Sequence, residues 1–180
     1  MQKLTNDLIV AAKENALAVR QALPLSAEVR EIWRHIESID DDGKHSPEPS
    51  PDLSSSNALH CPAAPPHWKG ATVFGVVLGP AETVHVEPEV VSPTLLEAIT
   101  PATPRETLRV SAICIKQHCR QWVAGNTGAQ GDGICSLAQR IVQFEQRTPA
   151  EADLPDCSRR PVCRWYAQHG GDACRVCPQV

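Results

Sequence analysis

Aromatic residues and long apolar runs are scarce in this sequence of 180 residues. Phe, Trp and Tyr together account for 4% of the chain, methionine occurs once, and 16 prolines interrupt it. An ordinary large aromatic core is therefore not expected. No run of about 18 apolar residues occurs, which excludes a membrane-spanning helix.

A strong excess of positive or negative charge is also absent. The formal net charge is −4, which argues against nucleic-acid binding through phosphate neutralisation.

The N-terminal residues do not have the pattern of a secretory signal. Residues 1–23 place four charged side chains among their apolar positions, namely Asp7, Lys13, Glu14 and Arg20. No small-residue cleavage site follows an apolar run. We therefore expect a cytoplasmic protein that does not associate with membranes.

Cysteine is missing from the first sixty residues and is concentrated near the end of the chain. Seven of the eight cysteines lie between Cys114 and Cys177. Because cytoplasmic thiols are kept reduced, clustered cysteines there favour metal or cluster binding over structural disulfides.

Residues 1–38 are predicted to form a helical hairpin. Apolar residues recur at helical spacing over residues 3–23, Pro24 ends this helix, and Ser26 is a plausible N-cap for a second one. Two helices alone bury too little surface to be stable. They must pack on the rest of the chain, on a second copy or on another protein, and we expect a protein partner to bind through this hairpin.

Residues 39–66 have a different composition, rich in proline, serine and acidic residues. Such a segment cannot bury enough apolar surface to fold, so we predict a disordered linker. Cys61 lies in this linker and is expected to be a free thiol, because a flexible segment is a poor metal ligand.

Residues 67–180 are predicted to form a cysteine-rich domain. Apolar and β-branched residues on both sides of Gly79–Pro80 predict a β-hairpin over residues 71–87, with His85 facing solvent. A short helix is expected after Ser92 and a strand over residues 108–113. The predicted fold is therefore small α+β: a helical hairpin, a disordered linker, and a metal-organised domain with a short β-hairpin and much irregular structure.

The seven clustered cysteines follow the spacing Cys-x4-Cys-x15-Cys-x21-Cys-x5-Cys-x10-Cys-x2-Cys. The final Cys-x2-Cys-Pro places two thiolates on one turn, where both can reach one metal centre. The most closely spaced set is predicted to form one complete site: Cys157, Cys163, Cys174 and Cys177. The remaining set lacks a fourth ligand: Cys114, Cys119 and Cys135. His118, His169 or Cys61 could complete it, or it could bind a cluster with one open iron.

Both zinc and an iron–sulfur cluster are compatible with thiolate ligands. Structural zinc sites combine short Cys/His pairs, whereas most gaps here are long and irregular, and seven thiols do not divide into groups of four. A cluster gathers ligands from distant loops, so we favour an iron–sulfur cluster, [4Fe–4S] rather than Zn²⁺.

Basic and aromatic residues accompany these cysteines. Three arginines are each adjacent to a cysteine and are expected to bind the cluster by donating to its sulfides: Arg120, Arg164 and Arg175. Trp122, Trp165 and Tyr166 are expected to shield the site from water. The order Cys–Cys–Arg–aromatic–Gly/Asp–Cys occurs twice, from Cys114 and from Cys157, which suggests an internal repeat.

Residues 157–178 contain the pattern Cys…Arg-Pro-Val-Cys-Arg-Trp…Gln-His-Gly…Ala-Cys-Arg-Val-Cys-Pro. This pattern resembles the C-terminus of a family of poorly characterised bacterial cysteine-rich proteins, and residues 109–119 and 135–138 are similar to that family as well. The resemblance covers about residues 70–180. It implies that the cysteines are ligands, as in iron–sulfur proteins, and it implies no activity.

Three functions follow from these features. The first is an iron–sulfur protein that transfers electrons or assists a partner enzyme. The second is a zinc-stabilised protein-interaction module. The third is an enzyme that uses a three-cysteine cluster with an open iron. We expect a carrier or accessory protein rather than an enzyme, because no nucleotide-binding loop or hydrolase motif is present.

Overall fold

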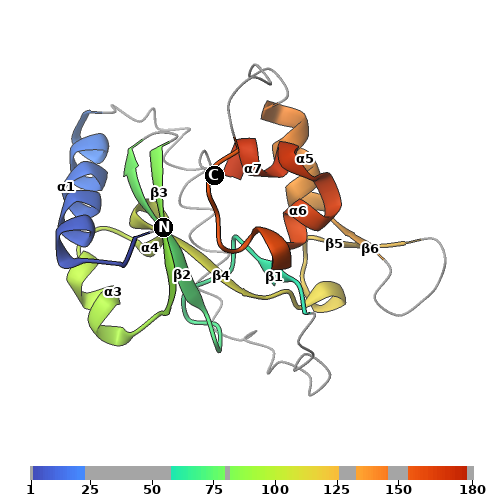
Figure 1. Cartoon of the computed structure of the whole chain (residues 1–180), viewed down its shortest axis with the longest axis horizontal. Helices are drawn as coiled ribbons and strands as arrows, with labels where there is room; N and C mark the ends of the chain where they lie inside the picture. Colours follow the sequence, from blue (N-terminus) through green and yellow to red (C-terminus); the bar gives the residue numbers. More distant parts are fainter. Residues whose placement is uncertain (1, 23–57, 80–81, 126–132, 146–153, 178–180) are drawn as a thin grey trace.

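The computed structural model describes residues 2–22, 58–79, 82–125, 133–145 and 154–177. The first predicted helix is present as α1 (Asn6–Ala22). The second predicted helix and most of the predicted linker lie outside the described residues. The described part is a small α+β structure in which helices lie on both sides of an antiparallel sheet (Figure 1).

Four strands form the main sheet in the order β1-β4-β2-β3. The predicted hairpin is confirmed as β2 (Thr72–Gly79) and β3 (Glu82–Val90), and the predicted strand at 108–113 is β4 (Leu108–Ile113), which pairs antiparallel with β2. β1 (His60–Cys61) adds to the outer edge of β4. The linker prediction is therefore wrong at its C-terminal end, because this segment pairs with a strand about fifty residues away.

One hydrophobic core lies between the sheet and the N-terminal helices. Ile9 and Ala12 of α1 pack against buried β2 residues such as Val73, so α1 packs on the rest of the chain. α3 (Pro93–Ile99) begins at Ser92, whose hydroxyl accepts a hydrogen bond from the N–H of Leu95 at 3.2 Å, as an N-cap residue does. α4 (Pro104–Thr107) leads from α3 into β4.

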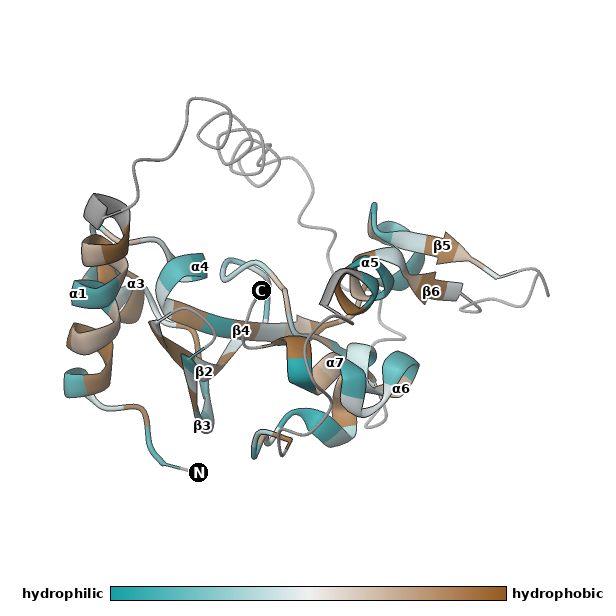
Figure 2. Ribbon diagram, turned by 90° about the horizontal axis from the view of Figure 1, so that it is seen from above, coloured by the Kyte–Doolittle hydropathy of each residue, from teal (hydrophilic) through white to brown (hydrophobic). Residues whose placement is uncertain are grey.

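A second, smaller core lies among the C-terminal helices α5 (Ser136–Glu145), α6 (Arg164–His169) and α7 (Gly171–Val176). Trp165, Ala138 and Val142 are buried there. A short hairpin of β5 (Trp122–Ala124) and β6 (Gly133–Cys135) leads into α5. The cysteine-rich region is thus more regular than its sequence suggests. Figure 2 shows these helices on the opposite side of the sheet from α1 and α3.

Within the described residues, no helix is long and apolar enough to cross a membrane.

Candidate functional site

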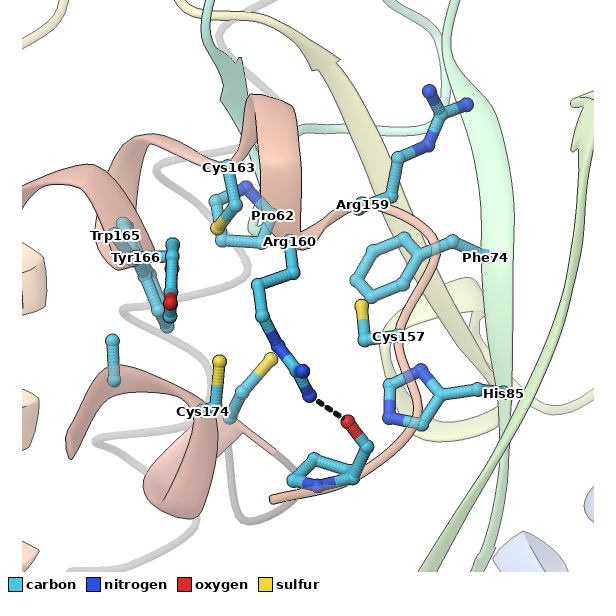
Figure 3. A pocket seen from close by; sticks show the side chains of 13 residues that line it. Pro62, Phe74, His85, Cys157, Arg159, Arg160, Cys163, Trp165, Tyr166 and Cys174 are labelled. Atoms are coloured by element: carbon cyan, nitrogen blue, oxygen red, sulfur yellow. Dashed lines mark hydrogen bonds between the residues drawn. The ribbon is translucent and has the colours of Figure 1, made fainter. Parts of the chain in front are cut away.

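Four cysteines line one hollow between the sheet and the C-terminal helices, which we call the C-terminal site. They are Cys157, Cys163, Cys174 and Cys177. The enclosed space at its centre is small, about 20 Å³, which is room for about one water molecule. Figure 3 shows the sulfurs of Cys157, Cys163 and Cys174 directed toward the same space, which the Arg160 side chain also enters. The structure therefore brings together the four residues predicted to form a complete site.

Two short helical segments position these cysteines. The 3-10 turn η3 (Arg160–Val162) ends at Cys163, whose N–H donates to the Arg160 carbonyl at 3.3 Å, and α6 begins directly afterwards. Gly170, with φ +59°, forms the corner between α6 and α7. This corner turns the chain back so that Cys174, on α7, lies on the same hollow as Cys163.

Backbone N–H groups point at two of the four sulfurs. The N–H groups of Arg159 and Arg160 point at the Cys157 sulfur, and those of Trp165 and Tyr166 point at the Cys163 sulfur. N–H groups in this arrangement stabilise the thiolate form, which is the form that binds metal. At Cys163, the N-cap residue of α6, these donors are the N–H groups of the first turn of that helix.

Burial dominates the ionisation of three of these cysteines. It raises the pKa of Cys157 and Cys163, and it raises the pKa of Cys177 to about 12. Neighbouring thiols raise these pKa values further, whereas Arg109 partly offsets the effect at Cys177. With their pKa values raised, the thiols of Cys157, Cys163 and Cys177 stay protonated at neutral pH, and binding of a metal would displace their protons.

Several buried N–H groups around the hollow lack an acceptor. The indole Nε1 of Trp165 and the Nε atoms of Arg159 and Arg160 have no hydrogen-bond partner among the described residues. Trp165 is only 2% exposed, and a buried donor without a partner costs about 1–3 kcal/mol. Arg159 and Arg160 donate through other nitrogens, to the Thr72 hydroxyl and to the Pro155 carbonyl. Arg164 and Arg175, which lie outside the hollow, have an unpaired Nε as well, so the indole N–H of Trp165 is the specific unpaired donor of this site.

The sheet contributes two further lining residues, Phe74 and His85. Their rings stack with a centroid distance of 6.1 Å. The prediction that His85 faces solvent is therefore wrong. Both faces of the sheet are covered by helices, so a polar residue that alternates with valines still points into the interior.

The three arginines predicted to bind the cluster lie outside the hollow. Arg120 is exposed, Arg164 stacks on the Trp122 ring with its guanidinium carbon 5.0 Å from the centroid, and Arg175 forms an ion pair with Asp172 at 2.9 Å. None of the three lines the hollow. Two other arginines do, Arg159 and Arg160. They lie between Cys157 and Cys163 but next to neither, so adjacency to cysteine does not indicate them.

Only two of the three predicted shielding aromatic residues line the C-terminal site, namely Trp165 and Tyr166.

The predicted internal repeat is matched by the structure only in part. The 3-10 turn η2 (Lys116–His118) ends at Cys119 as η3 ends at Cys163. The first copy then continues into β5 and the second into α6, so the two copies share a turn and not a fold.

The remaining four cysteines form a second set, which we call the upstream group: Cys61, Cys114, Cys119 and Cys135. Cys114 follows β4, Cys119 follows η2, and Cys135 ends β6. Burial raises the pKa of Cys61, and negative charge on the other three thiols raises it further. The charges of those three thiols therefore reach the Cys61 sulfur. None of the eight cysteines, all of which lie in described segments, forms a disulfide.

The predicted location of Cys61 in a disordered linker is wrong. It belongs to β1, packs against the core of the sheet, and lies near the three upstream cysteines. The pairing of β1 with β4 produces this position, and no local composition indicates it.

The two histidines predicted as possible fourth ligands lie on different elements. His118 is exposed on η2. His169 lies at the end of α6, and its ring Nε2 is 2.9 Å from the amide nitrogen of Gln168.

Substitution of Gly133 with alanine is expected to destabilise the hairpin that positions Cys135. A Cβ at Gly133, where φ is +156°, would lie 2.5 Å from the Val123 carbonyl oxygen and 2.5 Å from the Trp122 ring nitrogen. We expect a loss of about 3 kcal/mol in the free energy of unfolding, measured by urea denaturation. Gly70→Ala is the matched control. It has φ +73° but open space around its Cβ, so it should cost about 1 kcal/mol. Equal losses in the two variants would contradict this interpretation of the hairpin.

No protein-family model, curated protein or solved structure matches this chain. The resemblance to bacterial cysteine-rich proteins therefore stays a prediction.

Proposed function

We propose that the chain is an iron–sulfur protein that binds a [4Fe–4S] cluster through Cys157, Cys163, Cys174 and Cys177 and acts in electron transfer or beside a partner enzyme. The main support is the convergence of these four thiols on one hollow. The backbone N–H groups directed at two of the sulfurs and the unpaired N–H of the buried Trp165 ring add to it.

The irregular spacing of the cysteines along the sequence favours a cluster over a single zinc ion, because structural zinc sites combine short Cys/His pairs. A [4Fe–4S] cluster offers a separate iron to each thiolate, so it can gather ligands from distant loops. In the described part of the chain, no three His, Cys, Asp or Glu side chains are placed to hold one metal ion.

The chain's own residues have clear roles in such a site. The four thiolates would hold the cluster, while Trp165 and Tyr166 cover one wall and Phe74 covers another. Arg159 and Arg160 bring positive charge beside a group that carries net negative charge with its thiolates. Apolar walls and nearby donors set the reduction potential of a cluster, and a bound cluster supplies one-electron chemistry.

Purification without oxygen tests the proposal. The protein should be brown, absorb broadly near about 400 nm, and contain iron and acid-labile sulfide in equal amounts, about four of each per occupied site. Dithionite should bleach the absorbance, and air should restore or destroy it. A colourless protein with stoichiometric zinc would overturn the proposal and favour the interaction module. A colourless, metal-free chain that cannot be reconstituted with iron and sulfide would also overturn it.

A further inference from the structure

We infer that Cys61 completes a second four-cysteine site with Cys114, Cys119 and Cys135, and that this site takes a second iron–sulfur cluster beside the first. The inference rests on the proposed function for the chemical class of the bound group. Its residues are entirely different, however, so the two can fail separately.

Strand pairing places Cys61 beside Cys114. β1 and β4 are antiparallel, with Cys61 opposite Ala112, and the Cys114 N–H donates to the Leu59 carbonyl at 2.8 Å. Residues two apart on a strand share a face, so Cys61 and Cys114 are diagonal neighbours on the same face. Such pairs are about 7–8 Å apart at the backbone, within reach of side chains that converge on one group.

The β5–β6 hairpin brings in the other two thiols. Cys135 lies opposite Trp122, and the Trp122 N–H donates to the Cys119 carbonyl at 3.0 Å. The Ser136 N–H also donates to the Gln121 carbonyl at 2.7 Å, which holds the start of α5 against the segment after Cys119. Cys119 and Cys135 are therefore fixed at the same end of the hairpin, while η2 returns the chain from Cys114 to Cys119.

Cys61 also has the backbone environment of the other ligand candidates. Its sulfur accepts a hydrogen bond from the N–H of Ala63, two residues later in the chain. The Cys119 sulfur likewise accepts from the N–H of Gln121, two residues later, with a nitrogen–sulfur distance of 3.4 Å. The Arg159 and Trp165 N–H groups stand in this relation to the sulfurs of Cys157 and Cys163 in the C-terminal site. Each set of four thus contains two cysteines with a backbone donor at this position, and hydrogen bonds to ligand sulfurs are typical of iron–sulfur sites.

The two sites are joined through β1 and α6. His60, next to Cys61, forms a bridge with Cys163, and Pro62 on its other side lines the C-terminal site. Gln168 of α6 forms two hydrogen bonds with the Cys135 backbone, accepting from its N–H at 2.8 Å and donating to its carbonyl at 3.1 Å. Clusters in adjacent sites exchange electrons readily, so this arrangement favours an electron carrier. With four thiols present, the second site needs no open iron.

The test compares full-length wild type with Cys61→Ala and Cys114→Ala, each purified and reconstituted without oxygen. Wild type should contain about eight iron and eight sulfide per chain, and its reduced EPR spectrum should show interaction between two neighbouring spins. Each alanine variant should lose about half of its iron, or keep an altered three-cysteine cluster that loses one iron on oxidation. The spin interaction should disappear if the second cluster is lost and should change if an altered cluster remains. Ala63→Ser, which leaves the backbone donor in place, should match wild type.

The outcomes separate the inference from the proposed function. If wild type contains about four iron, and Cys61→Ala leaves both iron content and EPR spectrum unchanged, the second site is overturned while the first stands. If Cys114→Ala changes the spectrum and Cys61→Ala does not, Cys61 is not the fourth ligand. The C-terminal cluster signal, preserved in each variant, reports that the chain has folded. An absence of iron from every protein, wild type included, overturns the proposed function instead.

Discussion

Replacement of both Cys174 and Cys177 with serine is expected to remove about four iron and four sulfide per chain and to abolish the cluster in the C-terminal site. The two residues lie at the same end of α7 and supply half of that site's thiols. Serine has nearly the same size as cysteine, but its hydroxyl stays protonated at neutral pH and is a far weaker ligand for iron than a thiolate. The remaining two thiols cannot hold a cluster of four irons. Iron and sulfide analysis with absorbance near about 400 nm measures the loss.

The matched control for this double variant is Ala167→Ser. Ala167 is exposed on α6, which carries Cys163 at its start, and it does not line the hollow. Its iron content should equal that of wild type. If the double variant keeps the full iron, sulfide and absorbance of wild type, these two cysteines are not ligands, even if a cluster is bound elsewhere on the chain.

The sequence was informative wherever a feature depends on nearby residues. Alternating apolar residues around a Gly-Pro turn predicted the β2–β3 hairpin, and Ser92 predicted the start of α3. The C-terminal site is also formed by residues that are close together in the sequence. Its four cysteines fall within 21 residues of sequence, so short turns are enough to bring them together.

The position of Cys61 depends on pairing across a long stretch of chain. The segment before it is rich in proline and serine, and nothing in its own composition indicates that it joins the edge of β4. A two-residue strand has no detectable periodicity. The placement of Cys61 on the same face as Cys114 is therefore a result of tertiary structure, and it is the basis for the second four-cysteine site that we propose.

The arginines show the limit of adjacency as an argument. Arg164 and Arg175 each follow a cysteine, but helix geometry directs a side chain away from its neighbour in sequence. Arg175 therefore reaches Asp172 three residues earlier, and Arg164 reaches Trp122 on another element. Arg160 precedes Cys163 by three residues, about one turn, and its side chain enters the hollow.

The two neighbouring sites that we propose would suit electron transfer better than either alternative function. The open-iron enzyme needs a site with three thiols, whereas we propose that Cys61 supplies a fourth to the upstream group. β1 runs between the two proposed sites, because His60 forms a bridge with Cys163. A protein that accepts an electron at one cluster and releases it from the other would use this arrangement.

Removal of iron is expected to unfold the cysteine-rich helices while leaving α1 and most of the sheet folded. Among the described residues, the core beneath α1 and the sheet contains twelve buried apolar residues, whereas the core of α5, α6 and α7 contains six. α6 and α7 have six residues each, well below the roughly 12–15 residues that an isolated helix needs to be even marginally stable in water. Thiolate–metal bonds couple binding to folding and contribute on the order of 10 kcal/mol in structural metal sites. The C-terminal helices therefore depend on the cluster far more than the sheet does.

Hydrogen exchange on the full-length protein, with and without iron, measures this dependence. After an iron chelator has bleached the protein, amides in residues 160–177 should exchange at least about 100-fold faster, which corresponds to about 3 kcal/mol of lost protection. Amides in α1, β2 and β3 should change little. The same chelator saturated with iron beforehand is the control for direct effects on the protein. Unchanged protection of α6 and α7 after complete iron loss would mean that packing around Trp165 holds these helices without a metal, and that their stability does not depend on the cluster.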